Sequence, residues 1–332
     1  MIDMDSLKKN RHTWLITGVS GFIGSNLLET LLKLDQKVVG LDNHYTGCYD
    51  NITAALKHIP AEKQKNFTFH QGDISKKSAC QKAMQGIDFV LHQAALSSIP
   101  KSLKEIELTH KINTDGFFNI LLTAQETDVK RVIYASSCAI YGNKNPLPSV
   151  ETQSVDILSP YNATKYINEV YAQTFSTCYG LETIGLRYFN VYGPRQEAHG
   201  PYASVITRWI GELLEKKPTY IHDDHDQTRD FCYIEDVIRA NILAATTTNE
   251  AALNTIYNIA SSEETNLHVV YDLILKALDM TGPQPIAEPA GQGELMHSLA
   301  DTSKAKKLLG YTPQFTIKEG IPKLVAAILG EQ

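Results

Sequence analysis

The chain has 332 residues, of which 43 % are hydrophobic and 20 % charged, a composition typical of folded proteins that excludes a disordered scaffold. At roughly 150 residues per domain, this length favours about two structural units. The 37 acidic and 31 basic side chains give a net charge of -6, which is the wrong sign for a nucleic-acid partner.

Signals for membranes, disulfides and metals are weak. No apolar run approaches the ~20 residues of a membrane-spanning helix, and the start, MIDMDSLKKN, lacks a secretory apolar segment, so we expect a cytoplasmic protein. The five cysteines include no C-x-x-C pair, which argues against a disulfide framework or a thiolate metal site. His222 and His225 could be metal ligands, but a polar loop after a strand explains them better, and we expect no metal.

Strands and helices alternate through the first half of the chain. The apolar strand at 13–17 leads through Gly18 into a helix over about 22–34, in which leucines recur at helical spacing. The longest helix is expected over 160–178. Such alternation predicts a Rossmann-type, doubly wound parallel sheet. Its further strands are expected at 37–42, 67–73, 88–95, 131–137 and 183–189.

After residue 194 the alternation loosens, and the strands become too few for a second large sheet. This half therefore predicts a smaller α/β domain. Its expected elements are helices over 202–215, 235–245, 267–278 and after Ile317, a strand at 219–222, and a Pro/Gly-rich connection over 282–293.

Three glycines three residues apart, Gly18, Gly21 and Gly24, follow the first strand and open a helix. This spacing is typical of dinucleotide sites, where the turn is tight and the backbone approaches a pyrophosphate. Asp42 ends the second strand, where a carboxylate would bind the adenosine ribose and repel a 2'-phosphate, so NAD is expected rather than NADP. The expected cofactor site comprises Gly18, Gly21, Phe22, Ile23, Gly24, Asp42, Asn43, Asp73, Ile74, Ala94 and Ala95.

A candidate proton-transfer pair lies in the segment YNATK. Tyr161 and Lys165 are four apart at the start of a predicted helix and therefore share one face. Lowering the phenol pKa from ~10 to ~6 or 7 takes roughly 4 to 5 kcal/mol, for which Lys165 and a cationic nicotinamide are the candidates. Ser137, at the end of the fifth strand, could hydrogen-bond the same substrate hydroxyl. The alternative is an ordinary surface pair on a helix.

Several motifs along nearly the whole chain resemble the extended short-chain dehydrogenase/reductase family, and within it the nucleotide-sugar 4-epimerases. They are most similar to bacterial UDP-N-acetylglucosamine 4-epimerases, whose products feed surface polysaccharides. The motifs are GVSGFIG at 18–24, VVGLDNHYTG at 38–47, GDI at 72–74, LHQAA at 91–95, SSCAIYG at 136–142, SPYNATK at 159–165, LRYFNVYGPRQ at 186–196, TRDFCYIEDV at 228–237 and HSLADTSKA at 297–305.

The resemblance implies C4 epimerisation with bound NAD, in which Tyr161 takes the proton of the sugar 4-hydroxyl. It also implies that Lys165 holds the nicotinamide ribose and that Tyr188 lies near the nicotinamide. An NAD-binding domain over 1–185 and a mainly nucleotide-sugar-binding domain over 186–332, with some exchange of chain, are expected, as is a homodimer formed by helices around 104–126 and 160–178. The implied substrate residues are Ser97, Ser98, Ser137, Asn190, Gln196, Ser204, Tyr220 and Arg229.

Some positions depart from the family pattern or leave alternatives open. Gly291 and Met296 stand where relatives usually carry diphosphate-binding arginines, and Lys101 or a histidine could substitute. Tyr188 and Tyr220 could instead be core aromatics. A dehydratase or decarboxylase would need acidic residues where Cys138 and Ala139 stand, and a ketoreductase would prefer NADP, which Asp42 disfavours. A non-catalytic NAD-binding module is the remaining alternative.

Overall fold

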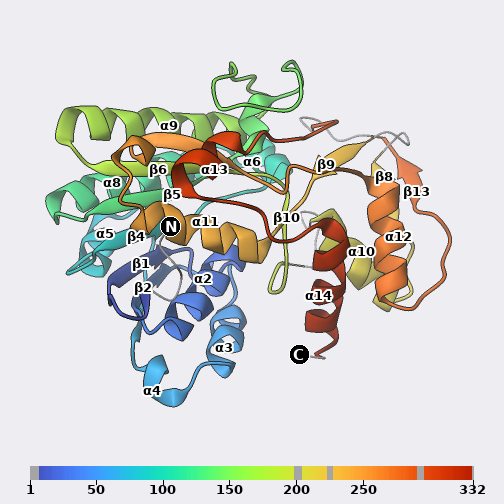
Figure 1. The fold of residues 1–332 in the computed structure, drawn as a ribbon, viewed down its shortest axis with the longest axis horizontal. Helices are drawn as coiled ribbons and strands as arrows, with labels where there is room; N and C mark the ends of the chain where they lie inside the picture. Colours follow the sequence, from blue (N-terminus) through green and yellow to red (C-terminus); the bar gives the residue numbers. More distant parts are fainter. Residues whose placement is uncertain (1–6, 198–203, 223–226, 290–294, 331–332) are drawn as a thin grey trace.

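The computed structural model describes residues 7–197, 204–222, 227–289 and 295–330. Within these residues, seven parallel strands form the main sheet in the order β11-β6-β5-β4-β1-β2-β3 (Figure 1). The prediction of a doubly wound α/β sheet is therefore confirmed. The strands are β1 (Thr13–Thr17), β2 (Lys37–Asp42), β3 (Phe67–Gln71), β4 (Phe89–His92), β5 (Arg131–Ser137), β6 (Glu182–Tyr188) and β11 (Thr255–Ile259).

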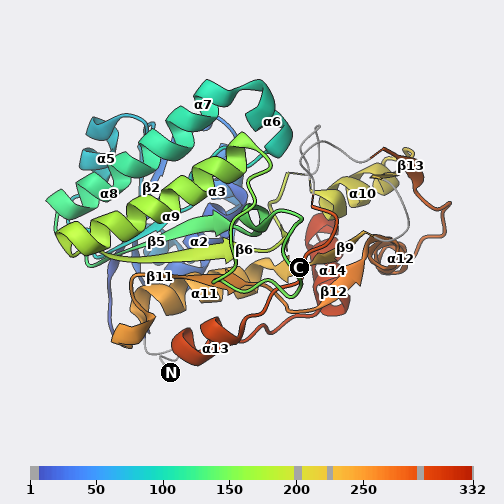
Figure 2. The ribbon, with the colours of Figure 1, turned by 90° about the horizontal axis from the view of Figure 1, so that it is seen from above.

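Side chains of the sheet alternate between two cores, one on each face, and helices cover both. In β1, Trp14 and Ile16 enter one core, whereas Leu15 enters the other. The first core is closed by α2 (Phe22–Lys33), α3 (Tyr49–Lys57) and α11 (Ile234–Thr246). The second is closed by α5 (Lys77–Ala83), α8 (Gly116–Glu126) and α9 (Pro160–Tyr179), and Figure 2 shows α8 and α9 side by side on this face.

The strand order reverses at β1. From β1 the chain moves outward through β2 to β3, and it then returns to β4 on the other side of β1. In open parallel sheets, ligands bind at the carboxyl ends of the strands beside such a reversal. The turn after β1 and the loops after β2 and β4 therefore surround the expected cofactor site. Short helices in these loops are α4 (Ala61–Gln64), α6 (Ile99–Lys104) and α7 (Ile106–His110).

The smaller part lies beside the carboxyl ends of the sheet (Figure 1). Its helices α10, α12 and α14 pack together, with Trp209 and Tyr271 in edge-to-face contact between the first two. Besides α11 and β11, the elements after β6 are β7 (Val191–Tyr192), α10 (Val205–Leu214), β8 (Tyr220–His222), β9 (Thr228–Asp230), β10 (Cys232–Tyr233), β12 (Glu264–Asn266), α12 (Leu267–Ala277), β13 (Ile286–Glu288), α13 (Ser303–Leu309) and α14 (Ile317–Leu329), with a one-turn 3-10 segment at Glu250–Ala252. Another 3-10 segment, Cys138–Tyr141, directly follows β5.

The elements differ from the predicted ones in several places. Strand β11, which pairs with β6 at the sheet edge, has no counterpart among the predicted strands. The connection over 282–293 contains β13, which pairs with β8. The helical stretch expected around 104–126 consists of α7, a π-helical turn at Lys111–Asp115 and α8. The helix expected over 202–215 is described from Val205. No helix among the described residues is long and apolar enough to span a bilayer.

Candidate functional site

The turn after β1 is shaped for a close approach of backbone to ligand. Gly18 has φ +72°, and a Cβ added there would lie 2.8 Å from the Ala94 amide nitrogen. A Cβ on Gly24 would collide with the carbonyl oxygen of Gly18. Side chains at these positions would push α2 away from the sheet. The glycines therefore leave the first turn of α2, from Gly21 through Phe22 and Ile23, open toward the carboxyl ends of β1 and β4.

Asp42 is held in a fixed orientation beside this turn. Its Oδ2 accepts a hydrogen bond from the Ser20 amide at 3.0 Å, and its Oδ1 accepts one from the His44 amide at 2.8 Å. Each oxygen keeps a further lone pair, so the carboxylate can still accept hydroxyl protons. This arrangement fits a ribose diol and opposes a phosphate at the same place.

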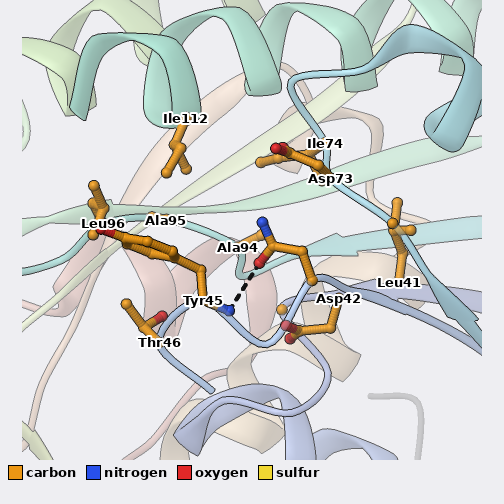
Figure 3. Close-up of a pocket in the computed structure, with 13 residues that line it drawn as sticks. Leu41, Asp42, Tyr45, Thr46, Asp73, Ile74, Ala94, Ala95, Leu96 and Ile112 are labelled. Atoms are coloured by element: carbon orange, nitrogen blue, oxygen red, sulfur yellow. Dashed lines mark hydrogen bonds between the residues drawn. The ribbon is translucent and has the colours of Figure 1, made fainter. Parts of the chain in front are cut away.

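A cavity of about 430 Å³ lies between these residues (Figure 3). Seven of the predicted cofactor residues line it: Gly18, Asp42, Asn43, Asp73, Ile74, Ala94 and Ala95. Its other lining residues, which were not predicted, lie near the ends of the same strands, after them, or in the π-helical turn: Leu41, Tyr45, Thr46, Gly72, Leu96 and Ile112. The glycine turn, the oriented carboxylate and this cavity fit a dinucleotide.

Ser137 and Tyr161 meet where β5 ends and α9 begins. Ser159 caps α9 by accepting the Asn162 amide proton at 3.2 Å, and this fixes Tyr161 in the first helical turn. The side chains of Ser137 and Tyr161 lie near each other. Burial raises the pKa of Tyr161 to about 12, and the neighbouring Ser137 hydroxyl acts in the opposite direction. The protein's own groups thus do not bring this pKa down to ~6 or 7, which leaves that lowering to the cationic nicotinamide expected in the site.

Lys165 lies one turn further along α9 and is 2 % exposed. Its Nζ donates to the Ala135 carbonyl at 2.8 Å and lies 5.9 Å from the centre of the Tyr161 ring. Because this ammonium is turned toward Ala135, its effect on the phenol is limited. Burial lowers the pKa of Lys165 to about 8, and the charge of Glu169 opposes that shift.

Glu169 anchors a buried polar network behind Lys165. It forms a two-point ion pair with Arg187, at 2.9 and 2.8 Å, and accepts the Ser136 hydroxyl proton at 2.6 Å. Arg187 also donates to the Tyr141 hydroxyl at 2.8 Å, which in turn donates to Asn258 at 2.6 Å. The network connects α9 to β5, β6 and β11, and so fixes the helix that carries Tyr161 and Lys165.

Cys138 and Ala139 offer no acid or base next to Ser137. Ala139 has no polar side chain, and its amide donates to the Ser137 hydroxyl oxygen at 3.1 Å. Burial raises the pKa of the Cys138 thiol to about 12, so it stays neutral at physiological pH.

The predicted substrate residues Asn190 and Arg229 lie where β6 and β9 meet the segment around Met296. The Asn190 Nδ2 donates to the Asp230 carbonyl at 2.8 Å and to Ser298 Oγ at 2.9 Å. Arg229 Nη1 donates to the Met296 carbonyl at 2.8 Å. These contacts tie the three segments together. Gly291 and His225 lie outside the described residues.

The other predicted substrate residues are spread over several loops. Ser97 is exposed, whereas Ser98 caps α6 by accepting the Lys101 amide proton at 3.1 Å. Ser204 lies directly before α10. The Tyr220 carbonyl accepts the Trp209 indole proton at 2.8 Å. Gln196 lines a second cavity of about 570 Å³ between α10 and α14.

Tyr188 is buried, and its hydroxyl lies between two amides. It donates to Gln93 Oε1 at 3.2 Å and accepts from Asn241 Nδ2 at 2.8 Å. Its ring belongs to the larger core. Gln93 directly precedes Ala94, so these bonds connect Tyr188 to the loop that lines the dinucleotide cavity.

Asn113, in the π-helical turn, is a site residue that the sequence analysis missed. Its amide pairs with both backbone groups of Leu96, at 2.7 and 3.0 Å, and donates to Thr164 Oγ1 at 3.0 Å. It therefore connects the cavity wall to the helix that carries Lys165. Single π-helical turns are frequent at functional sites, but no spacing rule in the sequence marks this one.

Metal ligands do not gather in the described ranges, where no group of three or more His, Cys, Asp or Glu side chains could hold an ion. His222 ends β8, and the rest of the HDDHD segment is not described.

The comparisons agree with this geometry. Residues 14–260 match the model of the NAD dependent epimerase/dehydratase family. The chain is 34 % identical to a UDP-glucuronate 4-epimerase of Thermodesulfobacterium geofontis, over 94 % of each chain. It is 31 % identical to a UDP-N-acetyl-alpha-D-glucosaminuronate decarboxylase of Bacillus cytotoxicus, over 94 % of this chain and 96 % of the relative.

Among solved structures, a UDP-N-acetylglucosamine 4-epimerase of Methanobrevibacter ruminantium, in complex with UDP-N-acetylmuramic acid, is similar with a TM-score of 0.88. It is 30 % identical, and the match covers 97 % of this chain and 99 % of that one. The family match, the glycine turn and the oriented Asp42 agree on the cofactor, and the chain belongs to the NAD dependent epimerase/dehydratase family.

Proposed function

We propose that the protein is an NAD-dependent 4-epimerase of a UDP-sugar. The substrate pair we favour is UDP-N-acetylglucosamine and UDP-N-acetylgalactosamine, or the related uronic acids. The product would serve the synthesis of surface polysaccharides. The observation that carries the proposal is the nearness of Ser137 and Tyr161 at the carboxyl end of β5, in a sheet whose β1 and β2 ends line a dinucleotide cavity, with no acid or base at Cys138 or Ala139. The similar 4-epimerases support the choice of reaction.

In this mechanism each residue has a separate task. Tyr161, as the phenolate, takes the proton of the sugar 4-hydroxyl and later returns it, while Ser137 orients that hydroxyl. Lys165 holds the nicotinamide ribose. Bound NAD would supply a hydride acceptor and donor for the sugar C4, so that the transient ketose, once turned over in the site, could be reduced on its opposite face. Proton and hydride are both restored, so a cycle consumes no reductant.

The binding residues divide between the two parts of the molecule. NAD would be held by the turn from Gly18 to Gly24, by Asp42 and by the loops from Asp73 and Ala94. The sugar nucleotide would lie toward the smaller part, with Ser97, Ser98, Asn190, Gln196, Ser204, Tyr220 and Arg229 as the proposed contacts. The domain division near residue 185 is part of this proposal, with α11 and β11 returning to the NAD-binding side.

A homodimer is also part of the proposal. Helices α6, α7 and α9 carry several exposed apolar side chains on the outer face of the molecule, which a second copy could cover. They are Leu103, Ile106, Tyr166, Val170 and Tyr171.

The decarboxylase is the second candidate because a relative with that activity is 31 % identical. Decarboxylation would need a uronic acid and would release carbon dioxide. The site offers no carboxylic acid at Cys138 or Ala139, where the sequence resemblance leads us to expect one in such an enzyme. We therefore favour epimerisation.

The test is incubation of the NAD-loaded protein with a panel of UDP-, CDP- and GDP-sugars, followed by proton NMR. We expect inversion at C4 of a UDP-linked sugar without net formation of NADH. Release of carbon dioxide from a UDP-uronic acid would replace the proposal with decarboxylation. A ketoreductase would instead consume reduced cofactor, and no turnover of any sugar would favour a non-catalytic module.

A further inference from the structure

Two segments far apart in the sequence meet over the dinucleotide cavity. Tyr45 follows β2, three residues after Asp42, whereas Lys101 and Glu105 lie on and directly after α6, beyond β4. Strands β2 and β4 flank β1 on opposite sides, so about 10 Å of sheet lies between them. A contact between their loops must therefore cross the carboxyl end of β1, where the Gly18 turn forms the floor of the cavity.

Tyr45 makes that crossing. Figure 3 shows its side chain extending across the cavity from the Asp42 side toward Leu96. Lys101 Nζ lies 4.4 Å from the centre of the Tyr45 ring, in the position of a cation–π contact. The Tyr45 hydroxyl donates to Glu105 Oε2 at 3.2 Å. Two different interactions thus hold one ring to the segment at α6, which follows β4.

A neighbouring tyrosine shows that this placement is not common to the whole segment. Tyr49 is similarly exposed, at 56 % against 47 % for Tyr45, but it does not line the cavity. Its ring centre lies 5.8 Å from that of His44, just after β2, and 6.2 Å from that of Phe69 in β3, so these contacts stay on the β2–β3 side of the sheet. Tyr49 is therefore a natural control for Tyr45.

We propose that Tyr45, Lys101 and Glu105 form a clasp over the dinucleotide cavity that slows the release of NAD. This inference rests on the proposed epimerase function, in which NAD ends every cycle in its starting state and need not leave. Release between the two hydride transfers would remove the electrons and leave an oxidised sugar behind. A contact that bridges the cavity mouth and opens only when both interactions break serves such a cofactor.

The experiment measures cofactor exchange rather than turnover. The protein is loaded with radiolabelled NAD, mixed with excess unlabelled NAD, and sampled by rapid gel filtration for retained label. We expect Tyr45→Ala to release label about tenfold faster than the wild type, which corresponds to about 1.4 kcal/mol. Tyr45→Phe, which keeps the ring over Lys101, and Lys101→Gln should give smaller increases, and Tyr49→Ala should match the wild type.

A double variant tests whether the two side chains act as one contact. If they do, Tyr45→Ala combined with Lys101→Gln releases label no faster than Tyr45→Ala alone. Multiplying effects would show that Lys101 acts on the ligand by itself, and this would overturn the clasp, as would wild-type exchange in Tyr45→Ala or equally fast release in Tyr49→Ala. If Tyr45→Ala melts at a lower temperature, Tyr45→Phe and Lys101→Gln decide the question.

This outcome is separate from that of the proposed function. A wild-type protein that retains NAD and inverts no sugar would remove the epimerase assignment, whereas the exchange rates of the variants would still test the clasp. Conversely, a sugar-inverting protein whose Tyr45→Ala variant exchanges NAD like the wild type would keep its function and lose the clasp.

Discussion

At the scale of single residues, Tyr161 is the side chain on which turnover should depend most. Tyr161→Phe removes the hydroxyl near Ser137 and keeps the buried ring. We expect turnover to fall at least ~100-fold, the scale of general acid–base catalysis, while the purified protein still carries NAD. Proton NMR measures the C4 inversion and absorbance measures the bound cofactor.

The control for this prediction is Tyr166→Phe, on the same helix but exposed to solvent. It should leave turnover unchanged. Near-normal activity of Tyr161→Phe would show that another group moves the proton.

Breaking the ion pair between Glu169 and Arg187 should destabilise the fold strongly. Their side chains are only 6 % and 3 % exposed, so removal of one partner leaves the other charged and buried. For Glu169→Gln we expect a loss of about 3–5 kcal/mol in the free energy of unfolding, measured by urea denaturation.

The matched control is Lys144→Met, which breaks a pair between Lys144 and Asp156 in which Lys144 is 82 % exposed. Exposed pairs are screened by water, so this variant should unfold like the wild type. Equal effects of the two substitutions would mean that burial does not set the strength of the Glu169 pair.

At the scale of elements, Asp230 at the end of β9 holds neighbouring segments together. Its carboxylate accepts hydrogen bonds from the Ser261 amide and hydroxyl and from the Ser262 and Ala300 amides. Burial nevertheless raises the pKa of Asp230 from 3.8 to about 6. The folded protein therefore binds this proton more tightly than the unfolded chain does.

Protonation of Asp230 consequently contributes its full stabilisation below pH ~4, and this contribution is lost as the pH rises through about 6. The contribution to the free energy of unfolding is at most about 3 kcal/mol. Asp230→Asn cannot titrate, so the difference in free energy of unfolding between wild type and variant should shrink from pH 4 to pH 7. Denaturant unfolding at several pH values measures it. Parallel curves for the two proteins would contradict the prediction.

The elements that the sequence predicted are those with a strong local signal. Strands β1 and β2 are short apolar runs next to glycine or an acid, and α9 has a serine cap followed by proline. The strand β11 has no such flanks, and its partner β6 is encoded far earlier in the chain, so only the folded pairing identifies it. For the same reason β13 was hidden in a Pro/Gly-rich connection.

The site residues likewise divide into those that a local spacing in the sequence marks and those that only contacts in the folded chain reveal. Gly18, Asp42, Ser137, Tyr161 and Lys165 follow spacings that carry their own chemistry. Side chains that work through contacts across the chain, as in Asn113 with Leu96 and Tyr45 with Glu105, leave no pattern in the sequence. Spacing also says nothing about burial, which raises the pKa of Tyr161 and leaves its lowering to the nicotinamide expected in the site.

At the scale of the whole molecule, helix α2, which begins at the glycine turn, also contacts the chain where it leaves β7. Asn26 Nδ2 on α2 donates to the Pro194 carbonyl at 3.0 Å, and Glu29 pairs with Arg195 at 2.7 Å. Residues 193–196 lead from β7 toward α10. A shift of α2 would therefore be transmitted to residues 193–196. These contacts connect the cofactor side to the proposed sugar side.

The proposed dimer can be tested on the outer face of α9. Val170 is 51 % exposed there and lies among Tyr166 and Tyr171. In a dimer through this face, Val170→Glu would bury a charge against apolar side chains, which costs several kcal/mol. We expect the wild type to sediment as a dimer at micromolar concentration and this variant as a monomer.

The control is Val269→Glu on α12, where the valine is 46 % exposed but belongs to the smaller part. It places the same charge on a surface of similar exposure away from α9, so it should leave the dimer intact. If both variants remain dimeric, the interface lies on another face, because a glutamate among these side chains could not be tolerated inside it. A monomeric wild type would instead show that the apolar face of α6, α7 and α9 is left to solvent.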